Sequence, residues 1–536
     1  MAKKYLFFFI LFFSIQLQAQ PSVVRPKFIV GIVVDQMRWD YLYRYYDRYS
    51  NEGFKRLLSK GFSCENAMIN YLPSYTAPGH ACIYTGSVPS IHGIAGNDWI
   101  DNFTGRHWYC VEDTTVYPVG GSRIAGQMSP NNLLTTTITD ELRLATNFRS
   151  KVIGISMKDR GSILPAGHLG KAYWYDDSTG NLITSSFYEA ILPQWLNDFN
   201  NRRLPATYLS SPWETLYPLS TYTQSLKDDN PYEGKLKGEN APVFPHNYSK
   251  EKPGELRKIP MGNTYTLEAA KAAIKGENLG RNGTDFLCVS LSSPDYIGHN
   301  YTSNSIEVED TYLRLDKDIA SFLDYLDATI GAGSYLVFLS ADHGAAHNSV
   351  YLNDLKIHAG NQSETKLGKD LNTHLKSIFN RDELVKAVEN YQVVLNENVI
   401  EAYEVNRADL KNEIRKWLYK QYHVAYVLDM ENPGKEAVPE IIKEKAVNGY
   451  NRKRSGTLLI INDPGWYYGY AKTGTTHSTW HPYDTHIPLV FYGWKVPKGK
   501  TNRTVHMEDI APTLAALLRI QMPNGCIGNV ITEVVK

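Results

Sequence analysis

The chain has 536 residues, of which 43% are hydrophobic and 21% are charged, and its 56 basic residues balance 56 acidic ones. This length allows one large core with insertions, or two to three domains. The composition is ordinary for a globular protein, and the zero net charge argues against a nucleic-acid surface and against a polybasic membrane patch.

The first residues have the order of a secretory signal peptide. Lys3 and Lys4 precede the apolar run YLFFFILFFSI, and polar residues follow it. Because this run is too short to span a bilayer comfortably, we expect cleavage after Ala19 rather than a retained anchor. The sequence predicts a signal peptide at 1–19 and a mature chain at 20–536. That chain would be periplasmic or secreted, with no stable membrane insertion after cleavage.

Cysteine and tyrosine usage fit an exported protein. Five cysteines follow the signal peptide, and their spacing matches no zinc motif. One or two disulfides are compatible with export, and at least one thiol would stay free. The 37 tyrosines indicate aromatic packing of extracytoplasmic loops, with a sugar- or base-stacking surface as the alternative.

Hydrophobic periodicity predicts strands that alternate with helices. In chain order we expect a strand at 27–35, a helix at 41–60, a turn at Pro73 and Pro78 leading into a helix, a strand at 151–156, a helix at 264–275, a strand at 285–291, a helix at 305–330, a strand at 334–340, a helix at 406–421, strands at 457–461 and 487–492, and a helix at 507–519. Asn304 and Glu307 fit a capping box for the helix at 305–330.

Two long stretches interrupt this alternation. Residues 176–262 are dense in Tyr, Pro, Asn, Ser and Trp, and residues 345–475 contain charged helices. The predicted fold class is α/β, with a mostly parallel central sheet and helices on both faces. We interpret the two stretches as cap insertions over the rim at the carboxyl ends of the strands, with plain surface elaboration as the alternative for the first.

Polar residues lie at or near the ends of the apolar runs. They are Asp35, Lys158, Arg160, Asp295, Asp342, His343 and His477. Because the carboxyl ends of parallel strands share one rim, we expect residues hundreds of positions apart to meet there. A rim rich in Asp and His is typical of a metal pair.

The spacing of the candidate ligands supports this interpretation. Asp295 and His299 are four residues apart, which places both on one side of a helical turn. With Asp35, Asp342, His343 and His477 they make three carboxylates and three imidazoles. That set favours zinc over manganese or iron, and it is too large for one open catalytic zinc, so it suits two. Each residue alone could be an ordinary polar residue, but buried charges need partners.

Thr76 is the candidate nucleophile. It lies in YTAPGH, where Pro78 suits the first turn of a helix. The free N–H groups of such a turn favour a bound phosphate, and a nearby zinc would lower the pKa of the threonine hydroxyl. The alternative is that Thr76 only caps the helix.

The motifs VVDQ, SYTAPGH, GIAGND, SMKDRG, SSPDYIGH, SADHG and GTTHS occur in this order, followed by YDTHIPLVFYG. Together they resemble the alkaline phosphatase superfamily, and within it the monomeric PafA-type bacterial alkaline phosphatases. The resemblance extends from residue 27 to about 520. It implies a monomeric phosphate monoester hydrolase with two zinc ions and small-molecule substrates.

The resemblance also implies a role for each matching residue. Thr76 would become phosphorylated, Asn97 would donate to a phosphoryl oxygen, and Lys158 and Arg160 would bind the other non-bridging oxygens. One zinc would be held by Asp35, Thr76, Asp342 and His343, and the other by Asp295, His299 and His477. The chain reads THS where relatives often read THG. His481 and His486 therefore stay open as alternatives to His477.

Several reactions remain to be weighed. The cationic pair Lys158 and Arg160 favours monoesters, which carry more negative charge than diesters. A phosphodiesterase or nucleotide pyrophosphatase is the alternative. A sulfatase would need Cys or Ser where the chain has Thr76, so it is not expected. A secreted glycan-binding protein with a vestigial site is a more distant alternative.

Overall fold

The structure is a computed structural model that describes residues 24–248, 252–469 and 472–535. The expected signal peptide lies outside these residues. An 11-stranded sheet forms the centre, in the order β17-β2-β18-β10-β1-β9-β6-β7-β8-β5, with β19 paired to β2. Its strands are β1 (Phe28–Val34), β2 (Phe62–Met68), β5 (Pro118–Val119), β6 (Val152–Ser156), β7 (Lys171–Asp176), β8 (Asn181–Ser185), β9 (Asp285–Leu291), β10 (Tyr335–Ser340), β17 (His486–Ile487), β18 (Leu489–Gly493) and β19 (Gly499–His506).

The middle of the sheet is parallel, as expected. Strand β1 lies between β10 and β9, and β6 and β7 continue the parallel order beyond β9. Every residue of β1, β9 and β10 is buried, because helices cover both faces of the sheet. Strand β18 runs antiparallel to β10. The chain segment before β18, rather than the residues after it, therefore lies near the carboxyl ends of the parallel strands. The predicted fold class is confirmed.

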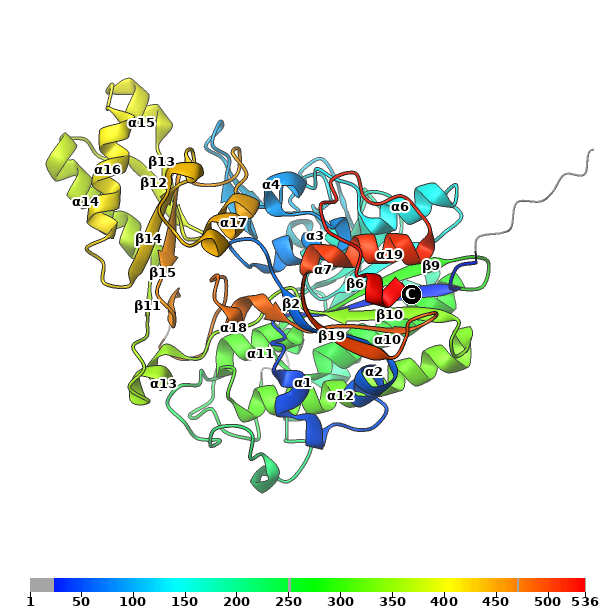
Figure 1. The fold of residues 1–536 in the computed structure, drawn as a ribbon. Coiled ribbons are helices and arrows are strands. Elements are labelled where there is room, and N and C mark those ends of the chain that lie inside the picture. The colour runs from blue at the N-terminus through cyan, green and yellow to red at the C-terminus, as the bar shows by residue number, and fades with distance from the viewer. Residues whose placement is uncertain (1–23, 249–251, 470–471, 536) are drawn as a thin grey trace, which may run out of the picture.

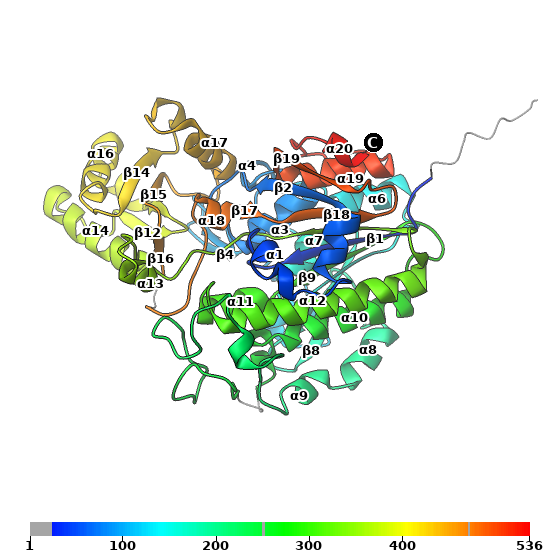
Figure 2. The ribbon, with the colours of Figure 1, turned by 60° about the horizontal axis from the view of Figure 1, so that its bottom comes forward.

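Helices form one layer on each face of the sheet (Figures 1 and 2). The upper layer of Figure 1 contains α3 (Thr76–Thr85), α6 (Ile138–Ala145), α7 (Asp159–Ala166) and α19 (Ile510–Leu518). The lower layer contains α1 (Tyr41–Arg44), α2 (Phe54–Lys60), α10 (Met261–Glu277), α11 (Ser293–Tyr301) and α12 (Ile306–Leu326). Two shorter helices, α8 (Gln194–Asn201) and α9 (Leu204–Tyr208), lie beyond α10 in Figure 2.

A second lobe stands beside the sheet, drawn in yellow and orange in Figure 1. Its antiparallel sheet has the order β12-β13-β15-β14 and its own hydrophobic core. The elements are β12 (Val385–Glu389), β13 (Gln392–Leu395), β14 (Val424–Asp429), β15 (Leu458–Asn462), α14 (Glu364–Phe379), α15 (Glu397–Ala402), α16 (Arg407–Leu418) and α17 (Glu440–Gly449). This lobe falls within the stretch 345–475. The first stretch, 176–262, begins at the end of β7 and contains β8, and both strands belong to the central sheet. The boundaries of the two insertions stay proposals.

Two local predictions were wrong. The helix expected at 41–60 is divided into α1, a short turn at Tyr46–Arg48 and α2. The Asp316 carboxylate accepts hydrogen bonds from the backbone N–H groups of Ser50 and Phe54, and this holds the chain in a turn between the two helices. Helix α12 is capped by Ser305, whose side chain accepts from the N–H of Val308, rather than by Asn304.

All five cysteines carry free thiols, four of them buried. Burial raises the pKa of each of these thiols. A raised pKa keeps a cysteine protonated and unreactive at neutral pH. Among the residues that the structure describes, no two cysteines form the disulfide that the sequence allowed.

A buried lysine gives a testable pH dependence where the second lobe meets the sheet. Lys445 of α17 is 3% exposed and donates to the carbonyl oxygen of Ile69. Burial lowers its pKa to about 8, below the ordinary value that it regains on unfolding. Between these two pKa values the unfolded chain binds the extra proton, so the stability that Lys445 contributes rises with pH.

We expect the substitution Lys445→Met to increase the free energy of unfolding most at pH 7, where the native protein buries a charged ammonium group. From pH 7 to pH 11 the free energy of unfolding of the natural chain should rise relative to the variant by up to about 3 kcal/mol. Urea denaturation of both proteins at several pH values measures this difference. A difference that does not change with pH would contradict the assignment.

Candidate metal centre and nucleophile

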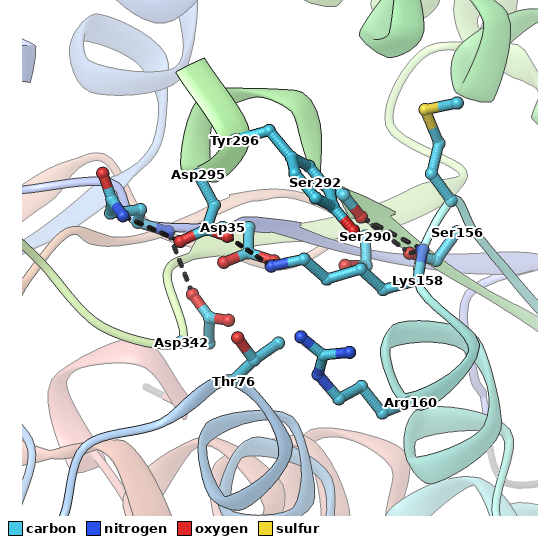
Figure 3. Close-up of polar contacts among 12 residues, drawn as sticks. Asp35, Thr76, Ser156, Lys158, Arg160, Ser290, Ser292, Asp295, Tyr296 and Asp342 are labelled. Carbon is cyan, nitrogen blue, oxygen red and sulfur yellow. Dashed lines mark hydrogen bonds and ion pairs between the residues drawn. The ribbon is translucent and has the colours of Figure 1, made fainter. Parts of the chain in front are cut away.

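Three buried carboxylates meet at the carboxyl ends of three adjacent parallel strands (Figure 3). Asp35 directly follows β1, Asp342 follows β10, and Asp295 lies in the first turn of α11, just after β9. Asp35 and Asp342 are fully buried, and Asp295 is 4% exposed. The alternation of strand and helix therefore gathers residues that are more than 300 positions apart.

Lys158 lies between two of these carboxylates. Its Nζ is 2.6 Å from Asp35 Oδ2 and 2.6 Å from Asp295 Oδ2. Burial opposes the charged form, but Asp295 and Asp35 raise the pKa of Lys158 above its ordinary value. The chain thus places a positive charge between the carboxylates, in the kind of position that a metal cation also takes.

Three imidazoles complete the cluster, and each is held in the same way. Nδ1 of His299 is 2.8 Å from the carbonyl oxygen of Thr475, and Nδ1 of His477 is 2.9 Å from that of Ser74. Nδ1 of His343 is 3.0 Å from the carbonyl oxygen of Gly344. A backbone acceptor at Nδ1 fixes the tautomer and leaves Nε2 as the nitrogen that could bind a metal.

The Nε2 atoms point to the carboxylates. Nε2 of His299 and of His477 lie 3.1 Å and 3.7 Å from Asp295 Oδ1, and Nε2 of His343 lies 3.5 Å from Asp35 Oδ1. The rings of His343 and His477 stack with their centroids 3.4 Å apart. The predicted ligands of the first zinc therefore lie next to the predicted ligands of the second.

Burial and mutual repulsion keep two of these rings neutral. Burial lowers the pKa of His343 to about 4. It also lowers the pKa of His477 well below its ordinary value, with His343 and His299 adding to the effect. A neutral imidazole is the form that binds a metal.

The donor set fits metal ions on three observations. Two groups, Asp295–His299–His477 and Asp35–Asp295–His343, each bring their ligand atoms within 4.8 Å of one another. Oδ1 of Asp35 and Oδ2 of Asp342 are buried and accept no hydrogen bond within the described part of the chain, and Oδ2 of Asp35 is paired with Lys158 alone. Burial and the charge of Asp35 raise the pKa of Asp342, as expected of carboxylates crowded together without enough positive charge.

Thr76 is the first residue of α3, and its side chain faces this cluster (Figure 3). Its Oγ1 lies 3.4 Å from Nε2 of His343. The N-cap position belongs to Tyr75, so Thr76 does not serve as the cap. Gly79 allows the helix to approach closely, because a Cβ atom there would lie 2.5 Å from the backbone oxygen of Asp342.

Asn97 and Arg160 lie close to Thr76, Arg160 in the first turn of α7 and Asn97 against the first turn of α3. Oδ1 of Asn97 accepts from the N–H of Ala77 at 2.9 Å, so its amide nitrogen is the end left to donate to a ligand. Figure 3 shows the guanidinium group of Arg160 directed toward Thr76. The ten predicted site residues, from seven separate chain segments, thus lie around one place.

The other two histidine candidates lie elsewhere. Nε2 of His481 contacts the carbonyl oxygen of Asn462, and Nε2 of His486 contacts that of Glu65. The ring of His486 also stacks on Trp39, with centroids 4.6 Å apart. Neither imidazole faces the carboxylates, which leaves His477 as the histidine of this segment in the cluster.

Sequence reasoning missed the residues that support the cluster. Gln36 donates from Nε2 to Asp295 and from its backbone N–H to Asp342. His80 contacts the carbonyl oxygen of Thr76 at 2.9 Å and Oγ of Ser290 at 2.8 Å. Tyr109 accepts from Arg160 and donates to Asp159. Gln36 directly follows Asp35 in VVDQ, and His80 follows Thr76 by one helical turn, so spacing could have indicated both.

Comparison with known proteins identifies the family. The model of the type I phosphodiesterase / nucleotide pyrophosphatase family matches residues 29–484. The alkaline phosphatase PhoV of Synechococcus elongatus is 52% identical, over 97% of this chain and 96% of its own length. PafA of Elizabethkingia meningoseptica is 50% identical, over 97% and 96%. The chain belongs to this family, and the resemblance to PafA-type alkaline phosphatases is confirmed.

The structural comparison agrees. The crystal structure of alkaline phosphatase PafA matches with a TM-score of 0.94 and 50% identity, covering 96% of this chain and all of that one. Another relative, from Myroides odoratus, is 54% identical over 98% of this chain and 97% of its own length, and is named a calcium-transporting ATPase. Among the described residues, no helix has both the length and the apolar character needed to cross a membrane.

Proposed function

We propose that the protein is an alkaline phosphatase that hydrolyses phosphate monoesters through a phosphothreonine intermediate. The observation that carries this proposal is the position of Thr76, which faces two adjoining groups of metal-binding side chains from the N-terminus of a helix. A solved PafA variant supports the choice of residues. It carries substitutions at one threonine, one asparagine, one lysine and one arginine, which are the residue types of Thr76 and its three predicted phosphate-binding neighbours here.

Two zinc ions, when bound, would lower the pKa of the Thr76 hydroxyl and stabilise charge on the leaving oxygen. Asp35, Thr76, Asp342 and His343 would hold one ion, and Asp295, His299 and His477 the other. We infer zinc because imidazole nitrogen and carboxylate oxygen are the donors present and no cysteine contributes.

The chain's own residues would position the phosphoryl group. Thr76 Oγ1 attacks phosphorus, the alcohol leaves, and water then cleaves the phosphothreonine to restore the hydroxyl and release phosphate. Asn97, Lys158 and Arg160 would neutralise and orient the non-bridging oxygens. Tyr109 supports Arg160 through a hydrogen bond of 3.0 Å, so the guanidinium group is already positioned before substrate arrives.

The charge of the cluster favours monoesters over diesters. A monoester dianion gains most from Lys158 and Arg160, whereas a diester carries one negative charge and a second ester group. We expect the purified zinc-loaded enzyme to hydrolyse p-nitrophenyl phosphate faster than bis-p-nitrophenyl phosphate, measured as kcat/KM. Faster turnover of the diester would favour the phosphodiesterase or nucleotide pyrophosphatase alternative.

The same argument predicts how a double variant behaves. Lys158→Ala combined with Arg160→Ala should lower kcat/KM for the monoester by about 10³-fold or more, because two cationic contacts to the phosphoryl group are lost. The loss for the diester should be clearly smaller. Both rates are measured on one preparation with a confirmed metal content. Equal losses would show that the pair supports the fold of the site rather than monoester recognition.

Location and assembly are further proposals. We propose that the protein acts in the periplasm or outside the cell as a monomer, with cap insertions near 176–262 and 345–475 that limit access to the rim. The signal-peptide pattern supports the first part. A glycan-binding role has no support from the cluster, whose side chains are acids, imidazoles and cations rather than stacked aromatic rings.

A further inference from the structure

A second buried acidic cluster lies where the loop at 226–246 meets the start of α12, below α11 in Figure 2. We call it the α12 acidic cluster; its members are Glu233, Glu239, His246 and Glu307. His246 and Glu307 are fully buried, and Glu233 is 3% exposed. None of these residues takes part in the proposed phosphatase chemistry.

The charges of this cluster do not balance. His246 contacts Glu307 Oε1 at 2.9 Å and Glu239 Oε1 at 3.2 Å. Burial opposes protonation of His246, but Glu307 and Glu239 raise its pKa, so it supplies one positive charge. Three carboxylates face that single charge, and no lysine or arginine in the described ranges forms an ion pair with any of them. With all three carboxylates ionised, the cluster would hold two negative charges without a counter-charge.

Two oxygen atoms in the cluster are also without partners. Oε1 of Glu233 accepts from Asn230 at 2.6 Å, but its Oε2 is buried with no hydrogen bond to any described residue. Oε2 of Glu307 is also buried and has no hydrogen bond to any described residue. Burial, and after it the charge of Glu307, raises the pKa of Glu233 to about 10. Buried acceptors without donors are costly unless a cation or a proton is added.

We propose that Glu233 and Glu307 bind a divalent cation, with Ca²⁺ as the best match. Two carboxylate charges equal the charge of one such ion. Calcium prefers hard oxygen ligands, accepts irregular geometry, and completes its shell with water and carbonyl oxygens. Zinc fits poorly, because both nitrogens of His246 are already engaged by carboxylates and only the catalytic groups bring three side-chain donors within 4.8 Å among the described residues.

The position of the cluster gives the ion a structural role. The loop that carries Glu233 is joined to the catalytic segments on both sides. The N–H of Gly234 donates to the carbonyl oxygen of Asn300 at 2.7 Å, one residue after His299. The N–H of Gly474 donates to the carbonyl oxygen of Tyr232 at 2.7 Å, three residues before His477. A bound ion would therefore fix the loop against two segments that carry candidate metal ligands.

Calcium binding is testable on the full-length enzyme stripped of metal and reloaded with zinc alone. Titration with Ca²⁺ should raise the melting temperature by about 2 °C or more, since an ion that binds only the native state stabilises it. Glu233→Gln and Glu307→Gln should remove this response. Glu401→Gln, an exposed residue of the second lobe, should keep it.

Terbium luminescence gives a second measurement that needs no variant of the acidic residues. The rings of Trp213 and Tyr301 lie 5.3 Å and 4.9 Å from the ring of His246, close enough to sensitise Tb³⁺ bound in the cluster. The zinc-loaded protein should give an emission that Ca²⁺ displaces and that falls in Trp213→Phe. An unchanged melting temperature together with no such emission would overturn the proposal, as would a calcium response that survives in Glu233→Gln; the two glutamates would then share a proton instead.

Discussion

Thr76→Ala should lose phosphatase activity almost completely, with kcat lowered by about 10⁴-fold or more, because the atom that attacks phosphorus is removed. Inorganic phosphate should still bind, since Asn97, Lys158 and Arg160 are retained. Steady-state kinetics and calorimetric titration with phosphate measure the two properties separately. Loss of turnover with retained binding is the expected pattern for a nucleophile.

Matched variants separate this role from a structural one. Thr76→Ser keeps a hydroxyl group and should retain measurable turnover. Thr85→Ala, at the other end of α3, removes a buried hydroxyl that bonds the carbonyl oxygen of Ala81, and should leave kcat nearly unchanged. If Thr76 were only a helix cap, its loss would cost about 1 kcal/mol of stability and little activity. Near-normal turnover in Thr76→Ala would refute the phosphothreonine mechanism.

The sequence predicts the core of this fold well because buried parallel strands leave a strong signal. The apolar runs at β1, β9 and β10 are continuous, and each is followed closely by a polar residue that the rim needs. The Asp295 and His299 pair was predictable for a similar reason. Helical spacing alone places both on one face of α11, and the structure has them there, 3.1 Å apart.

Features that depend on distant partners were not predictable. Strand β2 has weak periodicity and is formed by its pairing with β17, β18 and β19, which come more than 400 residues later. The break between α1 and α2 depends on the Asp316 carboxylate from another helix. Tyr109 becomes part of the site only because the fold brings it next to Arg160. Local propensity carries none of this information.

The α12 acidic cluster shows the same limit from the other side. Glu307 was assigned to a capping box, a local role, because only its neighbours in sequence were visible. In the structure it faces His246, which is 61 residues away, and its other oxygen is buried without a donor. The role of Glu307 therefore comes from the charged groups that the fold brings next to it, rather than from helix capping.

Removing metal should abolish activity as completely as removing Thr76. The three buried carboxylates at the strand ends have one lysine between them, so the site lacks the positive charge that a phosphoryl transition state requires. Treatment with EDTA should lower the rate to less than about 1% of its starting value, and Zn²⁺ should restore it. Ca²⁺ alone should not, because the imidazole donors favour zinc.

Metal content tests which histidine belongs to the centre. His477→Ala should lose about one of two zinc equivalents, since its Nε2 faces Asp295. His481→Ala is the matched control and should keep both, because its Nε2 contacts a backbone carbonyl instead. Elemental analysis of both variants beside the natural protein decides the assignment. Full activity after chelation, or equal zinc loss in the two variants, would contradict a centre built around Asp295, His299 and His477.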